Sequence, residues 1–173
     1  GQYLNLPYGF PVVPTDIPFT SELLQVCIQG LMARYPFLAR RTIATTLYRR
    51  PVTALSIGTG PRAVLYNASH HANEWITTPV LMKFLEEYAH AVSVNGRIFG
   101  MDAQRLFQQT RLYLVPMVNP DGVDLVTGEY DVGVSGGLTR YLIPGLGLVD
   151  VTSTLGGVDL GVRYGRQTFA DGP

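Results

Sequence analysis

Apolar and polar positions alternate along this chain in a way that predicts a series of helices and strands. Residues 21–35 repeat apolar side chains at helical spacing, and Thr20 or Ser21 can cap this helix. Its apolar stripe consists of Leu23, Leu24, Cys27, Ile28 and Leu31. Ahead of it, prolines recur through residues 1–19, which excludes a helix or a central strand there and predicts an extended strap or linker.

Three strand-like runs follow the first helix, over residues 41–49, 52–58 and 63–68. The third is short and apolar and leads directly into Ser69-His70-His71. A second helical pattern then covers residues 75 to about 92, and Pro79 is tolerated near its start because early helical N–H groups lack a partner within the helix.

The next elements complete the expected fold. Asp102 is expected to cap a short helix that ends at Gln109, and residues 111–118 form a strongly apolar strand. This strand ends in Asn119-Pro120-Asp121-Gly122, a composition typical of a turn. The order of elements predicts an α/β domain with a mixed β-sheet flanked by helices. Ligands in such sheets bind at the carboxyl ends of strands.

The character of the chain changes after about residue 128, where glycine is frequent and charge is sparse. No hydrophobic period persists in this tail. Residues 138–143 and 146–151 are predicted as short strands.

Composition narrows the class of protein. The chain has 173 residues, which fits one domain, with 46% hydrophobic and 15% charged residues, as in globular proteins. The formal net charge is zero, so no nucleic-acid partner is expected. No apolar run reaches the roughly 20 residues of a membrane span. Cys27 is the single cysteine, which excludes an internal disulfide and a cysteine zinc site.

The segment from Asn67 to Trp75 carries the most informative chemistry. An imidazole at His71 and a carboxylate at Glu74 are three residues apart and can converge on one side of a turn. A catalytic zinc site has three protein ligands and one open position for water, so His71 and Glu74 could supply two of the three ligands. His70 is expected to lie beside the site, as a structural or supporting residue and not a ligand, because neighbouring side chains of extended backbone point to opposite faces and His70 and His71 should not both face one metal. No histidine follows His90, so a third ligand is not evident.

The two motifs, in this order and on these elements, resemble the zinc carboxypeptidase family, peptidase family M14 with the funnelin fold. The matching residues are His70-His71-Ala-Asn-Glu-Trp75 and Val118-Asn-Pro-Asp-Gly122, and the likeness covers about residues 20–127. The variant is closest to bacterial γ-D-glutamyl-L-diamino-acid endopeptidases. The resemblance implies one zinc ion with His71 and Glu74 as its first two ligands. Asn73 stands where digestive carboxypeptidases have a substrate-binding arginine.

Two functional residues of the family have no counterpart in this sequence. The family's third ligand is a histidine, and its general base is a glutamate, both in the second half of the domain. Neither is found in this chain, so no catalytic residue is assigned. Gly157-Val-Asp-Leu160 only faintly echoes the segment that follows Asn-Pro-Asp-Gly in the family. We therefore expect residues 20–173 to be the N-terminal portion of a zinc-peptidase domain, truncated at its C-terminal side, with a divergent tail over 128–173.

These expectations imply a function and a location. The substrate would be a peptidoglycan stem peptide, cut between D-Glu and the diamino acid, in a bacterial cell envelope or secreted protein. Residues 1–19 would be a linker that begins with the end of a LysM module. The chain alone would be inactive, and its shortened sheet would leave an edge open to self-association.

Two other function classes remain open. A non-catalytic remnant could bind peptidoglycan through the same fold. An esterase-like enzyme would need a Gly-x-Ser-x-Gly elbow, which is absent from the sequence.

Overall fold

The structure is a computed structural model that describes residues 10–46, 48–127, 140–143 and 147–150. The larger elements, in chain order, are α1 (Ser21–Arg34), β1 (Ala39–Thr45), β2 (Pro51–Ile57), β3 (Arg62–Asn67), η2 (Ala72–Glu74), α2 (Thr77–Ser93), α3 (Ala103–Gln109), β6 (Thr110–Val115) and α4 (Pro120–Thr127). Two small hairpins complete the set: β4 (Arg97–Ile98) with β5 (Met101–Asp102), and β7 (Arg140–Ile143) with β8 (Gly147–Asp150).

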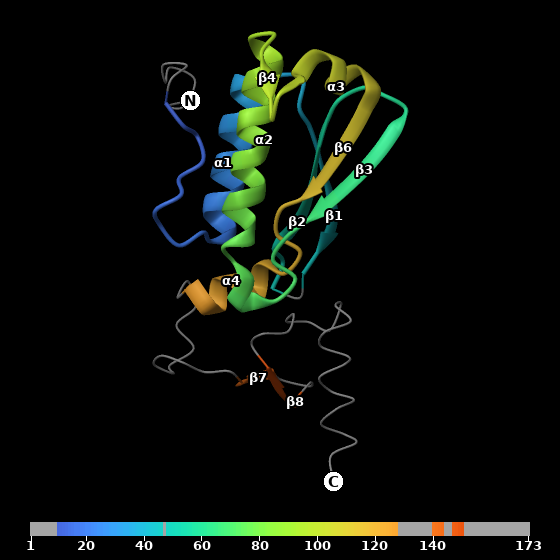
Figure 1. The fold of residues 1–173 in the computed structure, drawn as a ribbon. Coiled ribbons are helices and arrows are strands. Elements are labelled where there is room, and N and C mark those ends of the chain that lie inside the picture. The colour runs from blue at the N-terminus through green and yellow to red at the C-terminus, as the bar shows by residue number, and fades with distance from the viewer. Residues whose placement is uncertain (1–9, 47, 128–139, 144–146, 151–173) are drawn as a thin grey trace.

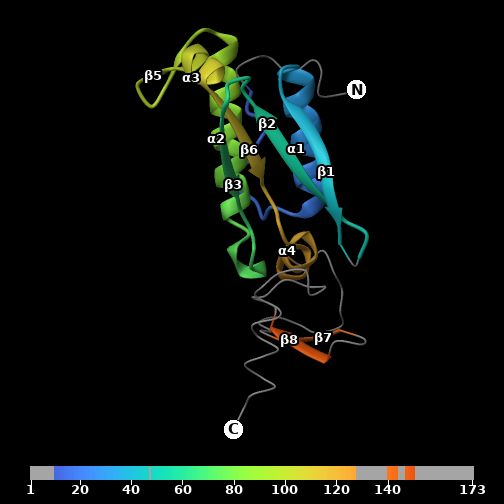
Figure 2. The ribbon, with the colours of Figure 1, turned by 90° about the vertical axis from the view of Figure 1, so that its right-hand side faces the viewer.

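The main sheet is mixed, as the sequence predicts. Its strand order is β1-β2-β6-β3, with β1/β2 and β2/β6 antiparallel and β3/β6 parallel (Figures 1 and 2). The parallel pair runs from Arg62 opposite Thr110 to Asn67 opposite Val115. Since both strands point the same way, their carboxyl ends meet at one edge of the sheet, where η2 and α4 follow.

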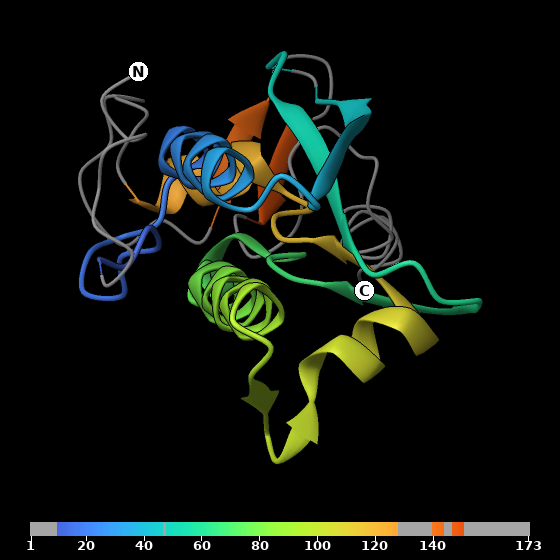
Figure 3. The same cartoon turned by 90° about the horizontal axis from the view of Figure 1, so that it is seen from above.

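Helices α1 and α2 lie side by side on one face of the sheet (Figures 1 and 3). Side chains from these helices and from β2 and β6 form one continuous core. Its largest fully buried members are Tyr35, Tyr88, Phe19, Ile28, Leu31, Leu55, Ile57, Met82, Leu85, Leu114 and Met117. Cys27 is also buried here, and burial, with a smaller contribution from Glu86, raises the pKa of its thiol to about 12. A buried, protonated thiol is a core residue, as its helical position indicates.

Residues 10–19 form a strap without helix or strand that packs on the two helices. The backbone N–H groups of Val12 and Val13 donate to the carboxylate of Glu86. Arg34 Nη1 donates to the carbonyl of Phe10 at 2.6 Å. Val13 and Phe19 are buried in the core. This part of the expected linker therefore contacts the domain closely, while residues 1–9 lie outside the described residues and the domain boundaries stay a prediction.

Several boundaries and one element differ from the sequence-based expectation. The strand predicted at 41–49 is β1, Ala39–Thr45, and the strand predicted at 111–118 is β6, Thr110–Val115. Asn119–Gly122 is not a free-standing turn, because Pro120 begins helix α4. Proline suits a first helical position as well as a turn, and the buried contacts of α4 decide between the two. The second long helix begins at Thr77 rather than Trp75, after the single 3₁₀ turn η2. The β7/β8 hairpin confirms the two short strands predicted in the tail.

Candidate metal centre

The ends of β3 and β6 bring the two predicted motifs together. Beyond the last paired residues, Ala68 N donates to the carbonyl of Val115 at 3.0 Å. Val118 N then donates to the carbonyl of Ala68, and Asn119 N to that of Ser69, each at 3.0 Å. The parallel ladder thus continues past the sheet edge, so the segment before His71 is fixed against the segment that begins α4.

His71 and Glu74 lie together at this edge. His71 precedes η2 in extended backbone, with φ −101 and ψ 145, and Glu74 ends the 3₁₀ turn. Nδ1 of His71 is 3.2 Å from Oε2 of Glu74, and the two side chains are 42% and 49% exposed. The one-turn spacing therefore points an imidazole nitrogen and a carboxylate oxygen toward each other in contact with solvent.

This donor pair fits a zinc ion. Zinc binds nitrogen at about 2.0–2.1 Å and carboxylate oxygen at about 2.0–2.2 Å, and a tetrahedral ion therefore places two such donors about 3.4 Å apart. The observed 3.2 Å needs only a small adjustment. Neutral imidazole and carboxylate are both ordinary zinc ligands. The assignment of these two residues as ligands stays a prediction.

Ser69 makes the corner that leads into the site. It has φ 51, in the left-handed region that costs roughly 1–2 kcal/mol for a residue other than glycine. Its backbone N donates to Thr77 Oγ1 at 2.8 Å, and its hydroxyl lies 2.6 Å from that of Thr78. Thr77 Oγ1 also donates to the carbonyl of Glu74 at 2.8 Å. These bonds offset the strain and fasten the corner to the start of α2.

The other two predicted site residues have different surroundings. His70 Nε2 lies 2.8 Å from Asn67 Oδ1, so a bond to β3 orients this ring. The side chain of Asn73 is exposed in the middle of η2. Its amide brings no charge to the position where digestive carboxypeptidases have an arginine.

Helix α4 packs against the turn that carries His71 and Glu74. Asn119 precedes the helix, and its Oδ1 accepts from Gly122 N at 3.0 Å, which satisfies one of the free N–H groups of the first turn. A Cβ added to Gly122 would lie 2.9 Å from Cγ of Asn119 and 3.0 Å from the Cβ of Ala72, which is fully buried in η2. Glycine at this position therefore leaves room for the Asn119 side chain and for close packing of α4 on the turn.

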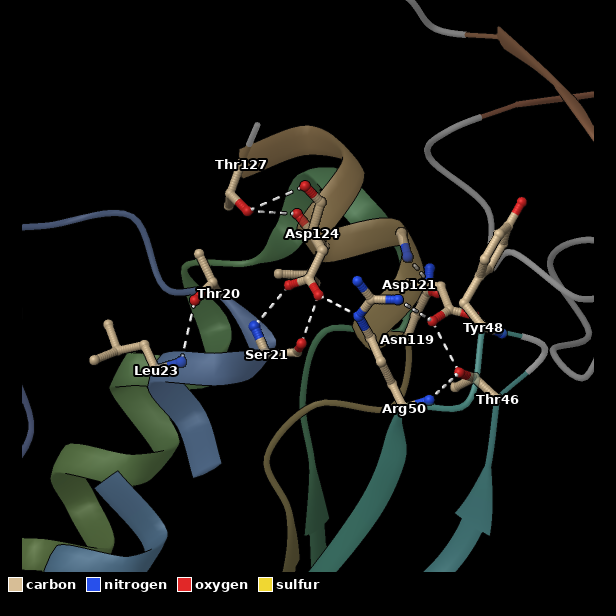
Figure 4. A network of polar contacts seen from close by, with 12 residues as sticks. Thr20, Ser21, Leu23, Thr46, Tyr48, Arg50, Asn119, Asp121, Asp124 and Thr127 are labelled. Atoms are coloured by element: carbon tan, nitrogen blue, oxygen red, sulfur yellow. Dashed lines mark hydrogen bonds and ion pairs between the residues drawn. The ribbon is translucent and has the colours of Figure 1, made fainter. Parts of the chain in front are cut away.

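Two acidic residues of α4 lie in a buried polar network with Arg50 (Figure 4). Asp121 accepts from Thr46 Oγ1 at 2.8 Å and from Tyr48 N at 3.4 Å, and lies 3.4 Å from Arg50 Nη1. Asp124 accepts from Arg50 Nε. Burial raises the pKa of Asp121 above its ordinary value, and the bonds from Thr46 and Tyr48 and the charge of Arg50 only partly oppose this rise.

A third ligand is not found in the described part of the chain. Among those residues, no three His, Cys, Asp or Glu side chains gather as a metal site. The segment Gly157–Leu160, whose sequence faintly echoes a segment of the family, lies outside the described residues.

Among the described residues, no helix is long and apolar enough to cross a bilayer.

The zinc carboxypeptidase family model matches residues 24–138, which include both motifs and the strands that carry them. The chain belongs to the zinc carboxypeptidase family. This confirms the resemblance drawn from the two motifs. Family members are hydrolases of metallopeptidase type, and membership implies the use of zinc.

Curated relatives extend the likeness over part of their own length. The chain is 46% identical over 99 residues to Gamma-D-glutamyl-L-diamino acid endopeptidase 1 of Lysinibacillus sphaericus, covering 57% of this chain and 25% of that protein. It is 44% identical over 108 residues to the uncharacterized protein YqgT of Bacillus subtilis (strain 168), covering 61% of this chain and 28% of that one. The chain thus spans about a quarter of the length of these relatives.

Solved structures show the same fold. Thrombin activatable fibrinolysis inhibitor matches 73% of this chain and 32% of its own, with a TM-score of 0.57 and 18% identity. A metallo-carboxypeptidase from Burkholderia cenocepacia matches 61% of this chain and 28% of its own, with a TM-score of 0.52 and 20% identity. These matches confirm a carboxypeptidase-like arrangement of sheet and helices.

The sequence reasoning missed the residues that hold the site in place. Ser69, Thr77 and Thr78 carry no family motif, and their only local signal is a serine at a strand end followed by paired threonines at a helix start. Arg50 and Asp121 are 71 residues apart in sequence, so no local pattern could have paired them.

Proposed function

We propose that His71 and Glu74 bind one zinc ion, and that the domain belongs to a metallopeptidase that cuts the γ-D-glutamyl–diamino acid bond of peptidoglycan stem peptides. The observation that carries the metal assignment is the 3.2 Å approach of Nδ1 and Oε2 at the carboxyl edge of the sheet. The similarity to Gamma-D-glutamyl-L-diamino acid endopeptidase 1 supports the substrate class. Such a substrate implies a protein of the bacterial cell envelope or a secreted one.

The chain's own residues would hold and orient the ion. Bound zinc supplies a water of lowered pKa and polarises the scissile carbonyl. His71 offers Nδ1 as a neutral donor, and Glu74 adds one negative charge that offsets part of the charge of the ion. Asn73 lies between them and can offer an amide, but no positive charge, to a substrate. This suits a substrate that is not an ordinary C-terminal peptide, because no arginine is present here for its carboxylate.

Two protein ligands hold zinc more weakly than the three of a complete catalytic site. We therefore propose that the 173-residue polypeptide by itself has little peptidase activity. Its general base stays unassigned, because the family's glutamate has no counterpart here. The two-ligand site also supports a second function, in which a chain of this fold binds peptidoglycan without cutting it.

Zinc stoichiometry and affinity test the metal assignment. We expect the chain to bind zinc weakly, His71→Ala to abolish this binding, and His90→Ala to leave it unchanged. His90 is the matched control, because it is a histidine on α2 outside the turn. Equal zinc binding by wild type and His71→Ala would show that the ion binds elsewhere.

Peptide hydrolysis tests the proposed lack of turnover. A peptide with a γ-D-Glu–diaminopimelate bond is incubated with the chain and added zinc, and release of the diamino acid is measured. We expect little release. Robust turnover that Glu74→Ala abolishes would contradict the proposed inactivity while supporting the metal assignment. Retention of the uncut peptide on the chain, measured by equilibrium binding, would favour the second function.

A further inference from the structure

We propose that Arg50 is a positioning residue for the turn that carries His71 and Glu74, and that it acts through Asp121 and Asp124 of α4. The inference rests on the proposed function, since it takes zinc binding as the task of that turn. Contacts between described residues link Arg50 to the turn in three steps: from the β1/β2 hairpin to α4, from α4 to α1, and from α4 to the turn.

The first step joins the β1/β2 hairpin to α4. Nε of Arg50 donates to Asp124, and Nη1 lies 3.4 Å from Asp121. The two carboxylates are one helical turn apart, so the planar fork of one guanidinium spans both, which a lysine ammonium cannot do. Thr46 Oγ1 adds a bond to Asp121 and accepts one from the backbone N of Arg50 at 3.0 Å. The hairpin therefore holds the first turn of α4 at two points.

The second step joins α4 to α1. Asp124 also accepts from the backbone N of Ser21 at 2.7 Å and from its hydroxyl. Ser21 is the first residue of α1, so Asp124 satisfies a free N–H group at the positive end of that helix. Figure 4 shows Asp124 between Ser21 and Arg50. With the hairpin on one side and α1 on the other, α4 has little freedom to shift.

The third step joins α4 to the metal-binding turn. Asn119, immediately before α4, donates its backbone N to the carbonyl of Ser69. Gly122 packs against Ala72, which is fully buried between His71 and Glu74 in sequence. A displacement of α4 therefore moves the backbone that carries both donors.

The donors themselves have little else to hold them. His71 and Glu74 are 42% and 49% exposed, whereas the side chains of Asp121 and Asp124 are 0% and 3% exposed. Binding an ion orders both the side chains of the ligands and the backbone that carries them, and the backbone part of this entropic cost falls when that backbone is already fixed. The buried network supplies that rigidity from outside the turn.

The main test compares zinc affinity, measured by competition with a chelator, in Arg50→Lys and wild type. We expect Arg50→Lys to bind zinc roughly 10-fold more weakly, the lower end of the usual effect of residues that orient metal ligands. Arg34→Lys is the matched control, because Arg34 is also a largely buried arginine that pairs with a carboxylate, Glu86, at the far end of α1. Both variants should lose thermal stability, but Arg34→Lys should keep wild-type zinc affinity.

Two outcomes of this test would contradict the proposal: equal zinc affinity in Arg50→Lys and wild type, or an equal loss in Arg34→Lys. If Arg50→Lys does not fold, Thr46→Val is the second variant. It removes the bonds of the Thr46 hydroxyl to Asp121 and from Arg50 N and leaves every charge in place. A smaller but measurable loss of zinc affinity is expected, and an unchanged affinity would also overturn the proposal.

Amide hydrogen exchange on the metal-free chain separates this proposal from the proposed function. If wild type binds no zinc, the metal assignment fails, and exchange alone decides the positioning role. We expect faster exchange at Val118 and Asn119, whose N–H groups bond to Ala68 and Ser69, in Arg50→Lys but not in Arg34→Lys. Unchanged exchange at both amides would overturn the role of Arg50.

Discussion

Two segments follow the neighbouring parallel strands β3 and β6 at their carboxyl ends: the turn with His71 and Glu74, and the start of α4 with Asp121 and Asp124. They differ in how far their polar side chains are buried. The side chains of His71 and Glu74 are about half exposed and contact each other at 3.2 Å. The second pair is buried and accepts bonds from the hairpin and from α1. In the sequence, both segments place a carboxylate at a predicted turn.

A carboxylate that could bind an ion differs from a structural one in how many of its acceptor positions are already occupied by donors of the protein. A carboxylate buried with arginine and hydroxyl donors has its acceptor positions occupied and is costly to disturb. An exposed carboxylate beside an imidazole keeps lone pairs free for an ion. The contrast supports the proposed roles, metal binding for the His71 turn and structural support for α4, and substitutions in either region test it.

Truncating one acid in each region should give the largest difference. Asp124→Ala removes the acceptor of Arg50 Nε and of the backbone N of Ser21 and should lower the free energy of unfolding by about 3–5 kcal/mol. Glu74→Ala, at an exposed position, should change it by less than about 0.5 kcal/mol. Urea denaturation followed by circular dichroism measures both. Similar losses in the two variants would remove the distinction.

A smaller difference is expected when a methyl group is added or a polar group removed. Gly122→Ala places a Cβ 3.0 Å from that of Ala72 and against Asn119, so it should cost about 1–3 kcal/mol through overpacking. Asn73→Ala, on the exposed side of the same turn, should stay within about 0.5 kcal/mol. Thermal unfolding of the pair checks this, and a stable Gly122→Ala would mean that Asn119 and η2 can move to admit the methyl group.

The smallest expected effect is a pH dependence of the free energy of unfolding that comes from Asp121 in α4. Burial raises the pKa of Asp121 above its ordinary 3.8, so its folded form binds the proton more tightly than its unfolded form. Its contribution to stability is therefore full below pH 3.8 and is lost as the pH rises through the folded pKa.

Asp121→Asn lacks this titration. The free energy of unfolding of wild type minus that of the variant should thus fall between pH 3 and 7, as measured by urea denaturation at each pH. A difference that grows with pH would show that Arg50 and Thr46 outweigh burial.

Local patterns were enough for most of the elements. Thr20 caps α1 by accepting from Leu23 N, and Asp102 caps α3 by accepting from Arg105 N, both at predicted helix starts. These features depend on residues three positions apart. The misread element was α4, because Asn-Pro-Asp-Gly suits a turn and a helix start equally, and only its burial against η2 and the hairpin selects the helix.

The candidate site was predictable in part for the same reason. His71 and Glu74 are near neighbours, so their spacing alone indicated that they converge. Ser69 in the left-handed region, and Arg50 between two aspartates, could not be foreseen, because each depends on contacts across the sheet edge. No third ligand is assigned, and self-association through an exposed sheet edge stays a prediction.

By itself, the sequence determined the order of helices and strands, the mixed sheet and the pair of donors at the end of β3, since hydrophobic period, caps and short spacings act within a few residues. Only the tertiary structure decided that Asp121 and Asp124 are structural while His71 and Glu74 remain accessible. The physical reason is that the state of a carboxylate depends on burial and partners. The partners here come from the connection between β1 and β2 and from the start of α1, far away along the chain.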